Sequence, residues 1–177
     1  MGSIMGRLSV KENKNVYQQR REELGLSREH ASELMMSVPP ERIEKIENEK
    51  SLAHPDEILE MSVAYKEPHL CNYYCANDCP IGQKYVPEVK TKVLSQIVLE
   101  TLASLSSMNK KQDRFIEITA DGKIDESEIA DFVDIKMELD KISVTVETLR
   151  LWTEKMLADG RIDIDLYKRI LKEKKTK

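Results

Sequence analysis

Residues 19–27 read Gln-Arg-Arg-Glu-Glu-Leu-Gly-Leu-Ser, and residues 31–34 read Ala-Ser-Glu-Leu. A helix would end at Gly25, because glycine readily adopts the left-handed conformation that closes a helix. Ser27 would cap the next helix, since serine is among the preferred N-cap residues. The stretch therefore predicts two short helices joined by a tight turn.

Two further helices are predicted after this pair. The run Val38-Pro39-Pro40 marks a break, because proline fits only the first turn of a helix. Ile43 and Ile46 lie three residues apart and give a third helix its apolar face. Asp56 would cap a fourth helix, which runs over residues 57–64. Four short helices are thus expected in this part of the chain.

This order of elements resembles the helix-turn-helix domain of the phage-repressor (Cro/cI, XRE-like) family of transcriptional regulators. The resemblance covers residues 15–66 and is carried by residues 19–27, 31–34, 38 and 43–50. It implies a DNA-binding domain whose third helix enters the major groove. It also implies that bases are read by Glu41, Glu44 and Lys45, and that phosphates are met by Arg20, Arg21, Arg28 and Arg42.

The charge of this segment limits the expected affinity for DNA. Residues 11–66 hold nine Lys or Arg against twelve Asp or Glu, which gives a charge of −3. Since phosphate neutralisation supplies much of DNA affinity, one domain alone would bind weakly, and a homodimer presenting two domains is expected. The alternative is a protein-binding adaptor whose helix-turn-helix scaffold no longer contacts DNA.

All three cysteines lie in one short segment, as Cys71, Cys75 and Cys79. Thiolates bind zinc or iron–sulfur iron, and three cysteines with His69 would complete a tetrahedral zinc set. Two other interpretations stay open: a buried stripe of packed thiols, or a redox-active disulfide that leaves one thiol over. The metal or cluster site is the leading hypothesis, and it would make a regulator responsive to metal or redox state.

The C-terminal half predicts a helical hairpin. One helix runs from Leu94 to Ile116, and a second carries Ile135, Leu139, Ile142, Val146 and Leu149 at coiled-coil spacing. Two long helices that pair in this way have a narrow core. Any apolar remainder of the stripe would therefore attract a second chain, so the hairpin is the expected dimerisation element.

Two similar turns, Ala120–Asp125 and Ala158–Asp163, interrupt these helices. Gly122 and Gly160 would end a helix in the left-handed conformation, and the aspartates would cap the next helix. Glu128 would complete a capping box with Asp125. This helix-turn interpretation is preferred over a calcium loop, so calcium is not expected.

Composition excludes several classes of function. The net charge is −4, aromatic residues make up 5% and charged residues 34%, which is typical of helical proteins with many solvated faces. No apolar run approaches the length of a membrane span and no signal peptide is evident, so a cytoplasmic protein is expected. The scattered histidines and the lack of a phosphate loop predict a non-enzyme with no small-molecule substrate.

The expected architecture is therefore all-α. Residues 1–10 would be a disordered or vector-derived N-terminus, and residues 11–67 the helix-turn-helix domain. Residues 68–87 would be a cysteine-bearing linker, and residues 88–177 the hairpin.

Overall fold

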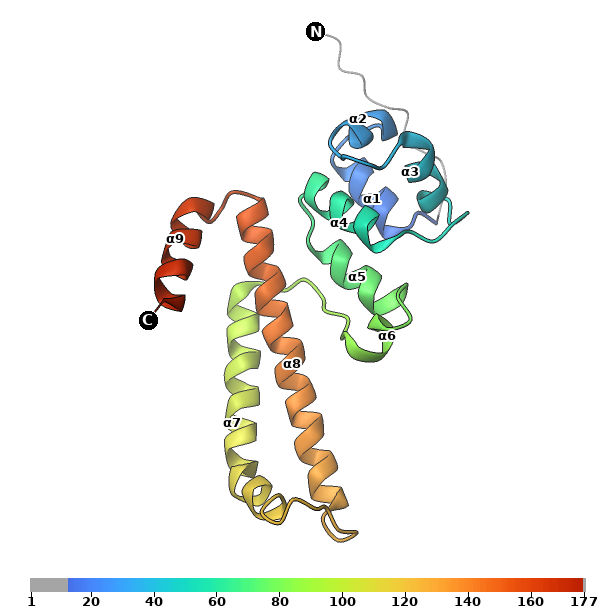
Figure 1. Ribbon diagram of the computed structural model, residues 1–177. Helices are drawn as coiled ribbons and strands as arrows, with labels where there is room; N and C mark the ends of the chain where they lie inside the picture. The colour runs from blue at the N-terminus through green and yellow to red at the C-terminus, as the bar shows by residue number, and fades with distance from the viewer. Residues whose placement is uncertain (1–12, 177) are drawn as a thin grey trace. The chain divides into compact units, whose positions relative to one another are not determined.

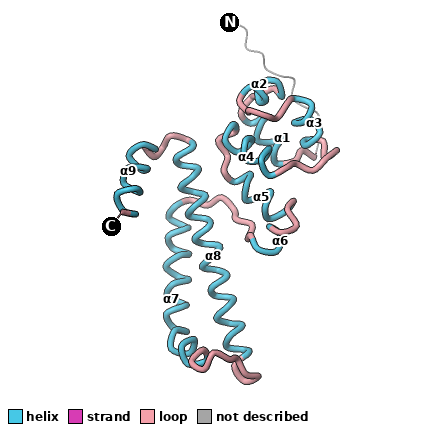
Figure 2. Tube along the Cα trace, in the orientation of Figure 1, coloured by secondary structure: helices cyan, strands magenta, loops and turns pink. Residues whose placement is uncertain are grey.

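The computed structural model describes residues 13–176 of the 177-residue chain. All regular structure in that range is helical, without a strand, and the helices are joined by loops and turns (Figure 1, Figure 2). The all-α prediction is confirmed. The predicted N-terminal extension, residues 1–10, lies outside the described residues.

The chain divides into two compact units. The first reaches to Glu88 and also takes in residues from Glu154 on, and the second spans Val89–Thr153. The short helices of the N-terminal half and the long hairpin thus belong to different units.

The first unit begins with four short helices, as the sequence predicted: α1 Val16–Glu23, α2 Arg28–Glu33, α3 Pro40–Glu47 and α4 Pro55–Ala64. Their core is made of side chains with at most 1% exposure, namely Ala31, Ile43, Ile58, Met61 and Tyr65. Burying each large apolar side chain contributes about 1.5–3 kcal/mol. Packing of these apolar faces therefore holds helices that are individually too short to be stable.

Of the three helix ends predicted at Gly25, Ser27 and Asp56, the first two are found in the structure. The Ser27 hydroxyl accepts from the backbone N–H of His30 at 3.1 Å, and Gly25 has φ +68°, so both predictions are confirmed. The prediction that Asp56 caps α4 is wrong, because α4 already begins at Pro55. There the Glu57 carboxylate accepts from the backbone N–H of His54 at 2.7 Å and satisfies the helix start instead.

The cysteine segment differs from the linker expected over residues 68–87. It forms α5 His69–Asn77 and the single-turn α6 Gly82–Tyr85, and α5 packs against α4. Leu70 is 4% exposed and belongs to the same core as the first four helices. This burial makes α5 part of the first unit, although its many turn-forming residues masked the helix in the sequence.

The second unit is a helical hairpin, as predicted. It contains α7 Leu94–Ile118 and most of α8 Ile129–Ala158, which run antiparallel side by side (Figure 1). A further helix, α9 Ile164–Lys175, follows α8.

Both turns that flank α8 have the predicted caps. Gly122 and Gly160 have φ of +72° and +70°. The Asp125 carboxylate accepts from the N–H of Glu128 at 3.2 Å, and the Glu128 carboxylate accepts from the N–H of Asp125 at 3.2 Å. Asp163 accepts from the N–H of Leu166 at 2.9 Å. The capping box and the second cap are confirmed.

The predicted seam of α8 is only partly buried. Ile135 is 2% exposed, but Leu139, Val146 and Leu149 are 42%, 60% and 40% exposed. Glu138, Thr145 and Thr148 are buried in their place. Helix α8 is therefore rotated about its own axis, so that only one edge of its apolar stripe faces α7.

Across residues 13–176, no helix is both long enough and apolar enough to cross a lipid bilayer.

Candidate nucleic-acid interface

The α2–turn–α3 segment is a compact pair fixed from both sides. Ala31 of α2, Val38 of the turn and Ile43 of α3 are at most 2% exposed. From α4, the Glu60 carboxylate accepts from the backbone N–H groups of Met36 and Ser37 at 2.7 and 3.0 Å. It also accepts from the Ser37 hydroxyl at 2.6 Å. The turn between the two helices is thus held in one conformation.

Through these hydrogen bonds the turn already binds an anion of the protein itself, the Glu60 carboxylate. The Ser37 hydroxyl and the backbone N–H groups hold the pKa of Glu60 below its ordinary value. Backbone N–H groups in such a turn can bind phosphate. Here the Glu60 carboxylate takes that place.

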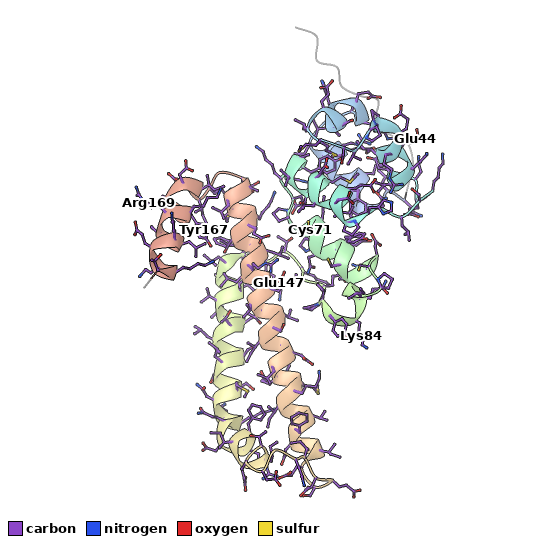
Figure 3. The ribbon with its side chains drawn as sticks, viewed as in Figure 1. Glu44, Cys71, Lys84, Glu147, Tyr167 and Arg169 are labelled. Carbon is purple, nitrogen blue, oxygen red and sulfur yellow. The ribbon has the colours of Figure 1, made fainter. Side chains whose placement is uncertain are left out.

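The outward face of α3 carries the predicted base-reading residues. Glu41 and Lys45 are exposed, and the Glu44 side chain is 45% exposed (Figure 3). The Lys50 ammonium lies 3.6 Å from the Glu44 carboxylate. The structure therefore brings Glu41, Glu44 and Lys45 together on one solvent-facing surface, in which acidic groups outnumber lysine.

Arg21 and Arg28 converge on one buried carboxylate. Arg21 Nε and Nη2 lie 2.5 and 2.9 Å from the Glu47 oxygens, and Arg28 Nε lies 2.8 Å from Glu47 Oε2. The Glu47 side chain is 0% exposed and that of Arg21 is 8% exposed. Burial lowers the pKa of Arg21, but the hydrogen bonds and charge of Glu47 raise it above its ordinary value. Arg21 is therefore an internal residue rather than the phosphate contact that was expected.

Arg42 and Arg20 also have internal partners. Arg42 Nε and Nη2 lie 2.5 and 2.7 Å from the two Glu57 oxygens, and Arg42 also donates to Ser51 and to the Leu52 carbonyl. Arg20 Nε donates to the Tyr65 carbonyl at 3.2 Å. Their side chains are 19% and 21% exposed, against 30% for Arg28. Of the four predicted phosphate contacts, Arg28 is the most accessible.

The cysteines are distributed along α5 and just beyond it. Cys71 and Cys75 are one helical turn apart, and the backbone N–H of Cys79 donates to the Tyr74 carbonyl at 3.0 Å. None of the three cysteines forms a disulfide, and all three are partly exposed. Cys71, labelled in Figure 3, packs against the core of the first unit. His69 is the first residue of α5 and is also partly exposed.

This arrangement does not fit a metal ion as it stands. Within residues 13–176, no three His, Cys, Asp or Glu side chains are placed to hold one. The zinc or iron–sulfur site at Cys71, Cys75, Cys79 and His69 stays a prediction from the sequence.

Close packing at one glycine fixes the segment around the cysteines. A Cβ added to Gly82 would lie 2.0 Å from the Cys75 carbonyl oxygen. Only a residue without a side chain allows α6 to approach α5 this closely. At the other end, the Tyr17 hydroxyl donates to the Asp78 carboxylate at 2.9 Å, and the Tyr17 and Tyr73 rings pack edge to face.

Sequence reasoning missed the internal partners of three glutamates. Glu47, Glu57 and Glu60 read as solvated helix residues, because their partners lie 15 to 26 positions away in the chain. The spacing of His54 and Glu57 is a weak signal of the α4 start, since an acidic residue three positions on is typical of a capping box. No comparable local signal marks Glu47 or Glu60.

Comparison with protein-family models, with curated proteins and with solved structures finds no match to this chain.

Proposed function

We propose that the protein is a sequence-specific DNA-binding transcriptional regulator that acts as a homodimer. The observation that supports this best is the rigid α2–turn–α3 pair with Glu41, Glu44 and Lys45 outward on α3. In such a pair the second helix enters the major groove, where lysine can donate to guanine and glutamate can accept from the cytosine amino group. These three side chains would read bases, and Arg28 would be the arginine most accessible to a phosphate.

The paired arginines shape how this binding would work. Internal acceptors occupy Arg20, Arg21 and Arg42, so few cations are left for phosphates. Affinity at one site would then be low, and it would depend only weakly on salt, because the salt dependence scales with the number of phosphates that the protein neutralises. Two domains held in one dimer gain affinity, because the second binding event becomes intramolecular. The proposal therefore expects a dimer as the binding species.

The same arginine pairing favours a second candidate function. A protein-binding adaptor would use the outward surface of α3 to meet a partner and would need no free cations. Its partner surface would be basic, since Glu41 and Glu44 dominate the exposed face of α3.

Selection of bound fragments from a random duplex library, at low salt and with the full chain, separates the two candidates. The DNA-binding proposal expects one enriched motif. Lys45→Ala and Glu44→Ala should each alter that motif, because both side chains would contact base edges. Lys84→Ala is the matched control, since Lys84 is an exposed lysine of α6, outside the α2–turn–α3 pair. Failure of the folded wild type to enrich any sequence would refute the proposal and favour the adaptor.

A response to metal or redox state was part of the function expected from the sequence. The cysteines as placed do not fit a metal ion, so the proposed function includes no metal-dependent step. A redox response would have to act through the three partly exposed thiols themselves.

A further inference from the structure

Polar contacts between α7 and α8 define the register of the hairpin. Arg114 Nε lies 2.7 Å from the Asp131 carboxylate, and Lys111 Nζ lies 3.3 Å from the Asp134 carbonyl oxygen. As residue numbers fall along α7 they rise along α8, so the helices are antiparallel, and Val98 lies near the level of Val146.

Another row of α7 residues, apart from these polar contacts, is uncharged and makes no polar contact with α8. It advances by three or four residues at each step, so its members share one side of the helix. Its apolar members are 40–59% exposed. The row is Leu94, Val98, Leu102, Leu105, Asn109 and Gln112. In a chain with 34% charged residues, such a long uncharged row on an exposed helix surface indicates a contact surface.

α8 carries a matching row of exposed apolar side chains. Phe132 and Val146 are 37% and 60% exposed, and Leu139 and Leu149 between 40% and 42%. Their spacing of seven, seven and three residues again keeps them on one side of the helix.

The two rows lie on the same side of the hairpin. On α7, Val98 directly follows the buried Ile97, and on α8 Val146 directly follows the buried Thr145. Each exposed valine is therefore rotated by about 100° from an inward-facing residue, in the same sense along its own helix. In an antiparallel pair, equal rotations of the same sense turn both residues toward one side. We call this surface, made of the two rows, the neutral face.

The hairpin needs this face to be covered. The buried apolar side chains of the second unit, within the described residues, are Val89, Ile97, Ile118, Ile135 and Leu151. So few buried side chains offset only part of the conformational entropy lost on ordering two long helices. Covering the neutral face would complete a core from which four-helix bundles gain their stability.

We infer that the neutral face is a dimer interface, which closes a four-helix bundle with the neutral face of a second copy. Uncharged rows allow two identical faces to meet without like-charge repulsion. The two rows run over residues 94–112 of α7 and 132–149 of α8, so the face is ~27 Å long and ~20 Å wide, or about 540 Å². Two such faces together bury about 1,100 Å², which exceeds the roughly 1,000 Å² expected of a biological interface. The choice of a second copy rests on the proposed function, which requires two DNA-binding domains.

Sedimentation equilibrium of the full chain over a range of concentrations tests this inference. The wild type should have twice the 20.4 kDa mass of the chain. Val146→Glu should raise the dimer dissociation constant by about tenfold or more, because it places a charge inside the interface. Met137→Glu is the matched control: Met137 is an exposed apolar residue of α8, 54% exposed, outside the neutral face. It should leave the dimer intact.

A second pair of variants guards against loss of folding. Gln112→Glu introduces the same charge into the α7 row without removing apolar surface, and Ser106→Glu introduces it at an exposed position of α7 outside the row. Only Gln112→Glu should weaken the dimer. A monomeric wild type, or equal effects of the neutral-face and control variants, would overturn the inference.

The outcome is separable from that of the DNA experiment. A dimer that enriches no DNA sequence would refute the proposed function alone. A monomer that enriches one would refute the interface alone.

Discussion

The Glu47 carboxylate lies 2.5 Å from Arg21 Nε, and none of the Glu47 side chain is exposed to solvent. The pair ties the end of α3 to α1, and Arg28 at the start of α2 donates to the same carboxylate. A single acidic residue thus connects the three helices that set the geometry of the helix-turn-helix pair.

Glu47→Gln should destabilise the protein by about 3 kcal/mol or more, because it leaves the buried Arg21 charge without its counter-charge. Urea unfolding of both proteins, followed by circular dichroism, measures the difference. Glu41→Gln makes the same change at an exposed position of α3 and should stay within about 0.5 kcal/mol of wild type. Equal effects of the two variants would show that the ion pair contributes little.

Gly82→Ala should separate α6 from α5. The new methyl group would overlap the Cys75 carbonyl, and overpacking of this kind costs about 1–3 kcal/mol. The backbone N–H of Val86, which donates to the Gly82 carbonyl at 2.7 Å, should exchange its hydrogen faster. Hydrogen exchange measured by mass spectrometry reports the separation of α6 from α5 and the faster exchange at Val86. Lys84→Ala adds no group near α5 and should exchange as wild type does; unchanged protection in Gly82→Ala would contradict the close packing of α6 on α5.

The protein should lose stability at alkaline pH in part through Tyr17. Burial first, and then the hydrogen bond to Asp78, raise the pKa of Tyr17 above its ordinary value. The folded state therefore keeps the proton that the unfolded state releases, so stability falls as the pH rises beyond about 10, the ordinary tyrosine pKa.

Tyr17→Phe tests this assignment. At pH 7 the variant should be about 1 kcal/mol less stable, because it lacks the hydrogen bond to Asp78. That deficit should shrink above pH 10, where the wild type is destabilised by keeping Tyr17 protonated. Urea unfolding at several pH values measures both quantities. Tyr85→Phe, at a side chain 70% exposed, should show neither effect, and a constant deficit at every pH would refute the role of Tyr17.

The cysteines give a prediction about covalent chemistry. Cys71 and Cys75 are four residues apart on α5, where Cβ atoms are about 5–6 Å apart, beyond the roughly 3.5–4.5 Å of a disulfide. Mild oxidation should therefore not link this pair while α5 is folded. Peptide mapping under non-reducing conditions checks the pairing, and a Cys71–Cys75 disulfide in folded protein would contradict it.

Elemental analysis of anaerobically purified protein tests the metal site predicted from the sequence. Zinc without colour, or iron with visible absorbance, would support it, provided that Cys75→Ser lowers the metal content. Folded protein with three titratable thiols and neither metal would leave the cysteines as packed side chains, in the arrangement that the structure describes.

The sequence by itself determined the features that depend on neighbours in the chain. Hydrogen bonds and backbone conformations within a few residues set the end of α1 at Gly25 and the start of α2 at Ser27. The same holds for the caps at Asp125 and Asp163. Helical periodicity likewise placed α7 and α8. Such features can be predicted because the interacting groups are close in sequence.

Only the tertiary structure decided which groups meet across the chain. The sequence predicted that Arg21 and Arg42 contact phosphates, whereas in the folded protein they pair with Glu47 and Glu57, 26 and 15 residues away. Folding also sets the rotation of α8 about its axis, so that Thr145 faces inward and Val146 outward. Periodicity fixes which residues share a side of a helix, but the side that meets a neighbour depends on how the helices pack, and no local pattern encodes that choice.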